Sequence, residues 1–221
     1  MIAQARFLRV PPYERGITLG DFILPIRIGE RTSVRQHHLA LVLLGVLVLA
    51  VSAQIVIPIP GTPVPISGQT FGVLTTATAL GFRRGIAAVG LYLILGFFLP
   101  IYAGGASGIA HIAAWQQEHV VLGPTGGYLV GFLLAAALVG RLAELGWDRR
   151  YAGALAAMLL GNLLIYAIGL PWLAAATGLS PSGALREGLY PFVVGDALKF
   201  LLAAAVFPAG WWIVGRRPSD R

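Results

Sequence analysis

The sequence contains few charged residues and no cysteine. Only 11% of its 221 residues are Asp, Glu, Lys or Arg, which is less than half the share in an average soluble domain. So few charged groups cannot cover the surface of a water-soluble protein of this size, and the mean hydropathy of +0.79 agrees. The lack of cysteine excludes disulfides, thiolate metal ligands and cysteine nucleophiles. This composition predicts a polytopic membrane protein.

Six apolar stretches approach the length of about 20 residues that a bilayer crossing requires. Their apolar runs are continuous rather than alternating, which favours helices over a β-barrel. The last stretch contains Pro191 and Pro208, so we expect a kink or a late start there. We predict an all-α membrane protein with six transmembrane helices at residues 39–57, 64–80, 85–102, 125–140, 151–170 and 188–215. The remainder comprises a basic cytoplasmic or interfacial segment at 1–38 and a basic tail at 216–221.

The arginines are divided unevenly between the two sides of this topology. Only Arg186 falls on one side, while the other side holds Arg6, Arg9, Arg15, Arg27, Arg31, Arg35, Arg83, Arg84, Arg141, Arg149, Arg150, Arg216, Arg217 and Arg221. The positive-inside rule therefore places both termini in the cytoplasm of a multi-pass plasma-membrane protein. Because the net charge of +7 is spread between apolar runs rather than gathered in one stripe, it does not indicate a nucleic-acid partner.

The N-terminal segment carries a short apolar pattern. Leu19, Phe22, Ile23 and Ile26 are spaced as on one face of a helix that lies along the membrane surface. Pro25 opposes that helix, and a disordered basic tail fits equally well. No apolar run follows a short basic start, so we do not expect a secretory signal.

Two connections on the outer side are rich in proline and glycine. Residues 58–65 contain four prolines in eight positions, which predicts a stiff, extended, non-helical turn. The stretch 100–123 contains Gly104, Gly105 and Gly108 around Ser107. Glycine permits close backbone approach, so this stretch is either built around a ligand or is an ordinary flexible loop.

The strongest single signal is Asp196 with Lys199 inside the sixth predicted span. Their i, i+3 spacing puts both side chains on one helix face, and Lys199 is the only lysine in the chain. Ionisable residues inside a span usually face a cavity or a partner. The pair offers a donor and an acceptor to a polar, uncharged ligand group. The structural alternative is an ion pair that only positions the helix, and a proton relay is disfavoured because the other acids and all histidines lie outside the apolar cores.

Four further polar side chains lie within the predicted spans: Gln54, Gln69, Tyr92 and Asn162. Interhelical hydrogen bonds commonly use such residues, so each is more simply explained as helix-to-helix contact. Gln69 is the best ligand candidate among them because it follows the proline-rich turn.

The fourth predicted span opens on Gly123-Pro124-Thr125-Gly126-Gly127. Proline suits the first turn of a helix, and the exposed N–H groups of that turn can bind an anion. Thr125 and Gly127 are therefore candidates for holding a carboxylate. The alternative is close helix packing, because Gly127, Gly131 and Ala135 repeat every four residues, as do Gly153, Ala157 and Gly161.

Three chemical signals fail. Residues 105–108 match the G-x-S-G of intramembrane serine proteases, but no histidine follows His119 on a later helix. An intramembrane enzyme using Ser107 and Asp196 is therefore the weaker hypothesis. The histidines form no metal-ligand pattern with carboxylates, and Lys199 is followed by Phe, so no P-loop is present. We predict no catalytic residues, no metal and no cofactor.

Five strings, in this order, carry a family resemblance: Val-Pro-Ile-Ser-Gly-Gln-Thr-Phe at 64–71, Gly-Phe-Arg-Arg-Gly at 81–85, Leu-Pro-Ile-Tyr-Ala-Gly-Gly at 99–105, Leu-Gly-Pro-Thr-Gly-Gly-Tyr-Leu at 122–129 and Gly-Asp-Ala-Leu-Lys at 195–199. Over about residues 40–215 the chain resembles the biotin-specific substrate-capture subunits (S components) of energy-coupling-factor (ECF) transporters, the BioY family. The resemblance implies a six-helix subunit that binds biotin near its outer face. It also implies a membrane coupling (T) component and a pair of ATPase subunits as partners. An S component for another vitamin remains an alternative.

The resemblance gives the polar residues a ligand. Asp196 would accept from the N–H groups of the biotin ureido ring, and Lys199 would donate to its carbonyl. The valerate carboxylate would point outward, toward the backbone at 104–108 or the start of the fourth span. Tyr92 and aliphatic neighbours would contact the apolar part of the ligand.

Overall fold

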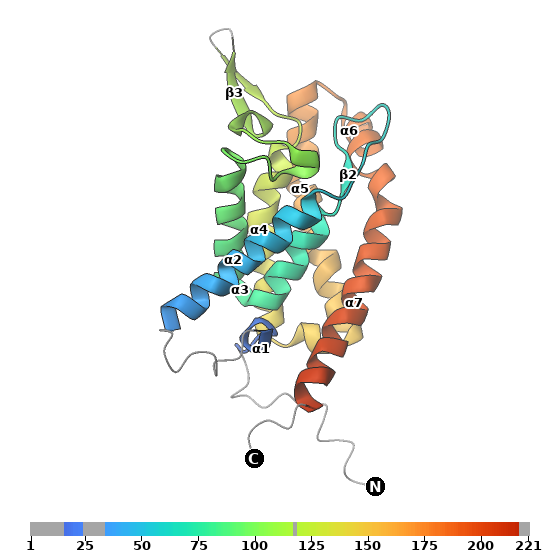
Figure 1. Ribbon diagram of the computed structural model, residues 1–221. Coiled ribbons are helices and arrows are strands. Elements are labelled where there is room, and N and C mark those ends of the chain that lie inside the picture. Colours follow the sequence, from blue (N-terminus) through green and yellow to red (C-terminus); the bar gives the residue numbers. More distant parts are fainter. Residues whose placement is uncertain (1–15, 24–33, 117–118, 217–221) are drawn as a thin grey trace.

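The computed structural model describes residues 16–23, 34–116 and 119–216, and Figure 1 shows their arrangement. Long helices run side by side, with α6 at one end of the molecule and α1 at the other; we call these the α6 end and the α1 end. The helices are α1 Gly20–Ile23, α2 Val34–Ala53, α3 Gln69–Gly96, α4 Gly126–Glu144, α5 Tyr151–Thr177, α6 Pro181–Gly188 and α7 Val193–Arg216. Short 3-10 turns cover Ala103–Gly105, Ile109–His111, Trp147–Arg149 and Tyr190–Phe192.

Two small antiparallel hairpins complete the described fold. Strand β1 (Val56–Ile57) pairs with β2 (Ile66–Ser67), and β3 (Ala113–Gln116) pairs with β4 (His119–Leu122). The first hairpin encloses the proline-rich turn at 58–65, which the sequence predicts to be extended. The second rises beyond the helices at the α6 end (Figure 1).

Within the described residues, five segments are long and apolar enough to cross a membrane: Arg35–Ala53, Gln69–Gly96, Gly126–Glu144, Tyr151–Thr177 and Pro181–Gly215. Helix α3 packs on α2 and α4, α4 packs on α5, and α7 packs mainly on α5. Small side chains such as Ala77, Ala88, Ala135 and Ala136 are fully buried between these helices, as is typical of membrane-helix interfaces. The chain is thus a predominantly helical, multi-pass membrane protein.

Helix α3 reverses direction within its length. Gly81 has φ +80° and ψ −175°, a non-helical conformation that only glycine adopts at low cost. The side chain of Gln69 lies 2.8 Å from the hydroxyl of Tyr92, although 23 residues of straight helix would separate them by about 35 Å. The two arms, 69–80 and 82–96, therefore lie antiparallel, and they correspond to the predicted spans 64–80 and 85–102.

Proline explains three of the predicted helix boundaries that are wrong. The first span does not reach residue 57, because α2 ends at Ala53 and Val56–Ile57 form a strand ahead of Pro58. The next helix starts at Gln69 rather than residue 64, after Pro65. The arm predicted to end at residue 102 stops at Gly96, shortly before Pro100.

The later spans differ as well. Helix α4 continues to Glu144 instead of residue 140, and α5 continues through Pro171 to Thr177 instead of ending at 170. A proline inside a membrane helix is tolerated where neighbouring structure satisfies the freed backbone groups. The final long helix starts at Val193, after a separate helix α6 and a turn that contains Pro191, rather than at residue 188.

The glycine repeats in α4 and α5 are packing positions, as the structural alternative for them predicts. A Cβ on Gly127 would overlap Trp172, and a Cβ on Gly131 would lie 3.0 Å from the Cα of Ile165. Gly161 has no room for a Cβ beside Val139. These glycines bring α4 and α5 together and thereby set the width of the space at the α6 end.

At the α1 end, a short segment is tied to the bundle by an ion pair. Asp21 accepts from Arg84 at 2.7 Å, and Arg84 also donates to the hydroxyl of Thr18 and the carbonyl of Leu80. Burial raises the pKa of Asp21, but the hydrogen bonds from Arg84 and Thr18 outweigh it and leave that pKa below its usual value. The ring of Phe22 packs edge-on against Trp211 at 5.9 Å. Of the apolar pattern predicted for a surface helix, Leu19 and Phe22 thus face α7, and Ile26 lies outside the described residues.

A second carboxylate at the α1 end is almost completely buried. Asp148, in the turn between α4 and α5, accepts from the indole N–H of Trp211 at 2.7 Å, and Arg149 lies over the Trp211 ring at 4.1 Å. Burial raises the pKa of Asp148 to about 6, with the Trp211 hydrogen bond and Arg149 acting in the opposite direction. Trp211 therefore joins α7, the turn after α4, and α1.

Candidate binding site

A cavity lies at the α6 end between the helices. Its empty space is about 560 Å³, counting the part open to the outside. Five stretches far apart in sequence form its wall: the β2 region and start of α3, the loop at Ala103, the start of α4, the middle of α5, and the segment from α6 to α7. The lining residues are Val64, Pro65, Ser67, Gln69, Thr70, Ala103, Thr125, Tyr128, Leu129, Phe132, Asn162, Ile165, Tyr166, Gly188, Phe192, Asp196 and Lys199.

Asp196 is the most heavily bonded group in this wall. Lys199, one turn further along α7, donates to its Oδ1 at 3.1 Å. Asn162 and Tyr166, both from α5, donate to its Oδ2 at 2.9 and 2.6 Å. The Asp196 side chain is 6% exposed and the Lys199 side chain 19%. A buried carboxylate is stable only when it is paired and hydrogen-bonded in this way.

The rest of the wall is mostly apolar, and its shape is fixed by tyrosines. Phe132, Ile165 and Phe192 are buried behind or beside the polar cluster. Tyr128 donates to the carbonyl of Gly188 at 3.0 Å, and its ring meets that of Tyr166 edge-on at 6.2 Å. An enclosed apolar site with a few converging polar groups is the usual form of a small-molecule site.

Four of the predicted site residues line the cavity: Asp196, Lys199, Gln69 and Thr125. Tyr92 is fully buried one layer further away. Its hydroxyl accepts a hydrogen bond from the side-chain amide of Gln69 and donates one to the carbonyl of Ile101 at 3.0 Å. Tyr92 therefore supports Gln69 and the following loop rather than forming the wall.

The predicted backbone sites lie beside the cavity rather than in its wall. Ala103 is the residue of this loop that lines it. Gly104, Gly105 and Gly108 all have positive φ, and Ser107 is exposed. The N–H groups of Gly105 and Gly108 already donate to the carbonyls of Tyr102 and Gly96.

At the start of α4, Thr125 faces the cavity while Gly127 packs against Trp172. The N–H groups of Gly126 and Tyr128 donate to the carbonyls of Gly123 and Thr125. Two of the backbone N–H groups in the first turn of α4, where the sequence predicts anion binding, are therefore already hydrogen-bonded to the protein.

Sequence reasoning did not select Tyr166, and it favoured helix contact for Asn162. Both lie on α5 at i, i+4, which places them on one helix face. That spacing was visible in the sequence, but only the packing of α5 on α7 shows that this face meets Asp196. The described residues contain no cluster of three or more His, Cys, Asp or Glu that could hold a metal.

A family model described as the BioY family matches residues 29–216. A biotin transporter BioY2 of Lactococcus lactis subsp. cremoris is 36% identical over 172 residues, covering 77% of this chain and 87% of that protein. A probable biotin transporter BioY of Pyrococcus horikoshii is 36% identical over 175 residues, covering 78% and 95%. Among solved structures, the crystal structure of an S-component for biotin from an ECF-type ABC transporter matches with a TM-score of 0.70 and 27% identity, covering 80% of this chain and 93% of that one.

Proposed function

The chain belongs to the BioY family, and on that premise we propose that it captures biotin at its α6 end for uptake through an ECF-type transporter. The observation that carries this function is the Asp196–Lys199 pair in the wall of a mostly apolar cavity that opens to the outside. The ureido ring of biotin has two N–H donors and one carbonyl acceptor, and it is uncharged. A charge-neutral pair that both accepts and donates is its natural complement.

The ligand is oriented by the distribution of polar groups along the cavity. Its ureido ring lies against Asp196 and Lys199, and its sulfur-containing ring lies among Phe132, Ile165 and Phe192. Gln69, which is held by Tyr92, also lines the cavity. The valerate carboxylate points to the mouth, where Thr125 and the backbone N–H groups of Gly104, Ser107 and Gly127 are the candidate donors, since those of Gly105 and Gly108 are already bonded. Thr125 and Ala103 reach the cavity itself, which supports this direction.

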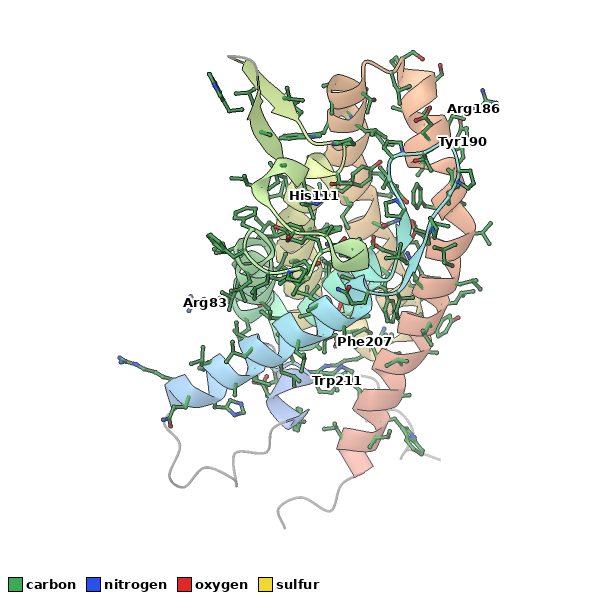
Figure 2. The ribbon with its side chains drawn as sticks, turned by 45° about the horizontal axis from the view of Figure 1, so that its top comes forward. Arg83, His111, Arg186, Tyr190, Phe207 and Trp211 are labelled. Carbon is green, nitrogen blue, oxygen red and sulfur yellow. The ribbon has the colours of Figure 1, made fainter. Side chains whose placement is uncertain are left out.

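The topology that goes with this function has six membrane crossings, because the two arms of α3 each cross once. The reversal at Gly81 and the Gln69–Tyr92 contact support that count. Figure 2 shows Arg186 and Tyr190 at the end opposite Trp211, while Arg141, Arg149 and Arg150 belong to the elements that meet near Trp211. The positive-inside rule then puts the α1 end in the cytoplasm and the α6 end outside.

Energy for uptake comes from separate subunits in this proposal: a membrane coupling (T) component and a pair of ATPases. The chain itself carries no P-loop sequence. The relatives named above are transporters, and Ser107, the residue on which an enzyme hypothesis depends, is absent from the lining of the cavity that contains Asp196.

The test is calorimetric titration of the detergent-solubilised chain with biotin. Asp196→Asn removes the charge that pairs with Lys199 and should weaken binding by about 30-fold, since a hydrogen bond to a charged group contributes about 2 kcal/mol. Glu187→Gln is the matched control, because it makes the same chemical change at the same end of the protein, outside the cavity wall. Desthiobiotin and unrelated vitamins complete the titration series.

Tight biotin binding that is weakened by Asp196→Asn but not by Glu187→Gln supports both the function and the site. Tight binding that both variants retain moves the site elsewhere and leaves the function in place. A folded wild-type chain that ignores biotin but binds another vitamin contradicts the proposed substrate.

A further inference from the structure

The hydrogen-bond capacity of Asp196 is nearly exhausted by the protein itself. A carboxylate offers about four acceptor positions. Asn162 and Tyr166 occupy both positions on Oδ2, and Lys199 occupies one on Oδ1. One position on Oδ1 remains, so Asp196 can accept one further N–H without breaking a bond that the protein already makes. A ureido ring carries two N–H groups, and the second requires another acceptor.

Tyr166 has the properties of that acceptor. The residue lines the cavity, and its hydroxyl commits its proton to Asp196 at 2.6 Å. A hydroxyl whose proton is committed has only lone pairs left, and donating to a carboxylate strengthens it as an acceptor. The ring is held by the edge-on contact with Tyr128, whose own hydroxyl is bound to Gly188. Tyr166 therefore presents an acceptor in a fixed place and cannot serve as a donor.

Asn162 keeps the carboxylate in this orientation. Its amide N–H donates to the same Oδ2 atom, and the reversed amide would place two acceptor oxygens against each other. Asn162 is 5% exposed, and its own Oδ1 has no hydrogen-bond partner among the described residues. Since the carbonyl of Asn162 has no partner among the described residues, the hydrogen bond from its N–H group to Asp196 is what holds this side chain in place.

Around Asp196 the wall then presents a free position on Oδ1 of Asp196, the hydroxyl oxygen of Tyr166, and the ammonium of Lys199, which has N–H groups beyond the one given to Asp196. The Oδ1 atom of Asn162 is a further acceptor, but it is buried within the protein. We propose that Tyr166 is a specificity-determining residue that accepts the second N–H of a cyclic urea, while Asn162 is a positioning residue that fixes Asp196. This inference rests on the proposed capture of biotin. It identifies the part of the ligand that the site recognises, which is a carbonyl flanked by two N–H groups.

Ligand chemistry separates this role from a purely structural one. Wild type and Tyr166→Phe are titrated with biotin and with the two derivatives that carry a methyl group on one or the other ureido nitrogen. In the wild type, methylation of the nitrogen that faces Tyr166 should weaken binding by about tenfold or more, because a donor is lost and an acceptor is left buried and unpaired. In Tyr166→Phe the same methylation should cost less than about threefold, because no acceptor remains to be left unpaired.

The second methyl derivative and a second variant serve as controls. Methylation of the nitrogen that faces Asp196 should cost the same factor in wild type and in Tyr166→Phe. Asn162→Ala should weaken binding of biotin and both derivatives by one common factor, as a positioning role requires. Tyr166→Met also lacks the hydroxyl and replaces Tyr166→Phe if thermal melting shows that the latter does not fold.

The inference is overturned if removing the Tyr166 hydroxyl weakens all three ligands by the same factor, because the residue then acts only on the protein. It is also overturned if biotin binding is unchanged in Tyr166→Phe. A wild-type chain that binds none of the three ligands removes the proposed function as well, which distinguishes that failure from the failure of Tyr166 alone.

Discussion

The two ends of the molecule each contain a carboxylate paired with a basic side chain, and the pairs are used differently. At the α1 end, Arg84 donates hydrogen bonds to the carboxylate of Asp21, the hydroxyl of Thr18 and the carbonyl of Leu80. At the α6 end, Lys199 gives one to Asp196 and borders a cavity. The pairs resemble each other in charge and in the burial of the basic side chain, although the Asp21 side chain is 32% exposed and that of Asp196 only 6%. Both basic groups keep N–H donors beyond these bonds, so the cavity beside Lys199 is what distinguishes the proposed recognition site from the structural ion pair.

The largest expected effect is on the cavity pair. Lys199→Met keeps the length of the side chain but removes the ammonium, so biotin should bind about 30-fold more weakly, or worse, because the ligand carbonyl loses a charged donor. Calorimetry measures the change, and thermal melting without ligand serves as the control for folding. Undiminished affinity in a folded variant would mean that the two pairs have the same, purely structural use.

The next effect concerns the buried carboxylate at the α1 end. Asp148→Asn retains an oxygen for the Trp211 N–H and removes a charge that burial disfavours, since the pKa of Asp148 is raised to about 6. A raised carboxyl pKa means that ionisation costs folding free energy as pH rises through about 6. The variant should therefore be more stable than wild type at pH 7.5, by about 1–3 kcal/mol, and the gain should shrink as pH falls to about 5.

Thermal melting of Asp148→Asn and wild type at the two pH values measures this difference. Biotin affinity should be the same in both proteins, because Asp148 lies at the opposite end from the cavity. A variant that loses stability at pH 7.5 would show that the Asp148 charge, through Arg149, contributes more than its burial costs.

The smallest expected effect is on the Asp21–Arg84 ion pair at the α1 end. Asp21→Asn weakens the bonds to Arg84 and Thr18 and should lower the free energy of unfolding by about 1 kcal/mol, as for a partly exposed ion pair. The pKa of Asp21 is lowered in the folded protein, so its contribution is present above the unfolded pKa and is lost as pH falls through the folded one. The deficit of the variant should therefore be largest near neutral pH.

Melting curves from neutral to acidic pH record that deficit, and a biotin titration completes the comparison. We expect unchanged biotin affinity at a temperature where both proteins are folded. An affinity loss equal to that of Lys199→Met would abolish the distinction between the two ends.

What the sequence alone could predict follows from the range of the interactions involved. The pairing of Asp196 with Lys199 was predictable because both lie on one turn of one helix. The membrane class followed from composition, and the turn near 81–85 followed from its glycines and arginines. Composition is a property of the whole chain, and the other two signals lie within a few residues of the structure that they predict.

The rest of the site depends on contacts between distant segments. Tyr166 and Asn162 meet Asp196 across 30 and 34 residues, and no local pattern states which face of α5 turns toward α7. Tyr92 illustrates the reverse case, because the family resemblance implied a ligand contact for it, whereas the reversal at Gly81 carries it behind Gln69. Helix ends were wrong wherever extended or irregular backbone next to a proline, as at Pro58 and Pro100, was counted into a span.

The assembly of the cavity wall from five separate stretches has a consequence for folding equilibria. No part of the chain contains the proposed biotin site by itself, because Gln69, Thr125, Tyr166 and Asp196 come together only when α3, α4, α5 and α7 are all in place. A ligand that binds only the complete bundle stabilises the whole of it, by about 2.7 kcal/mol at a free concentration 100 times its dissociation constant. Vitamin supply therefore acts on the lifetime of the folded protein as well as on the occupancy of its site.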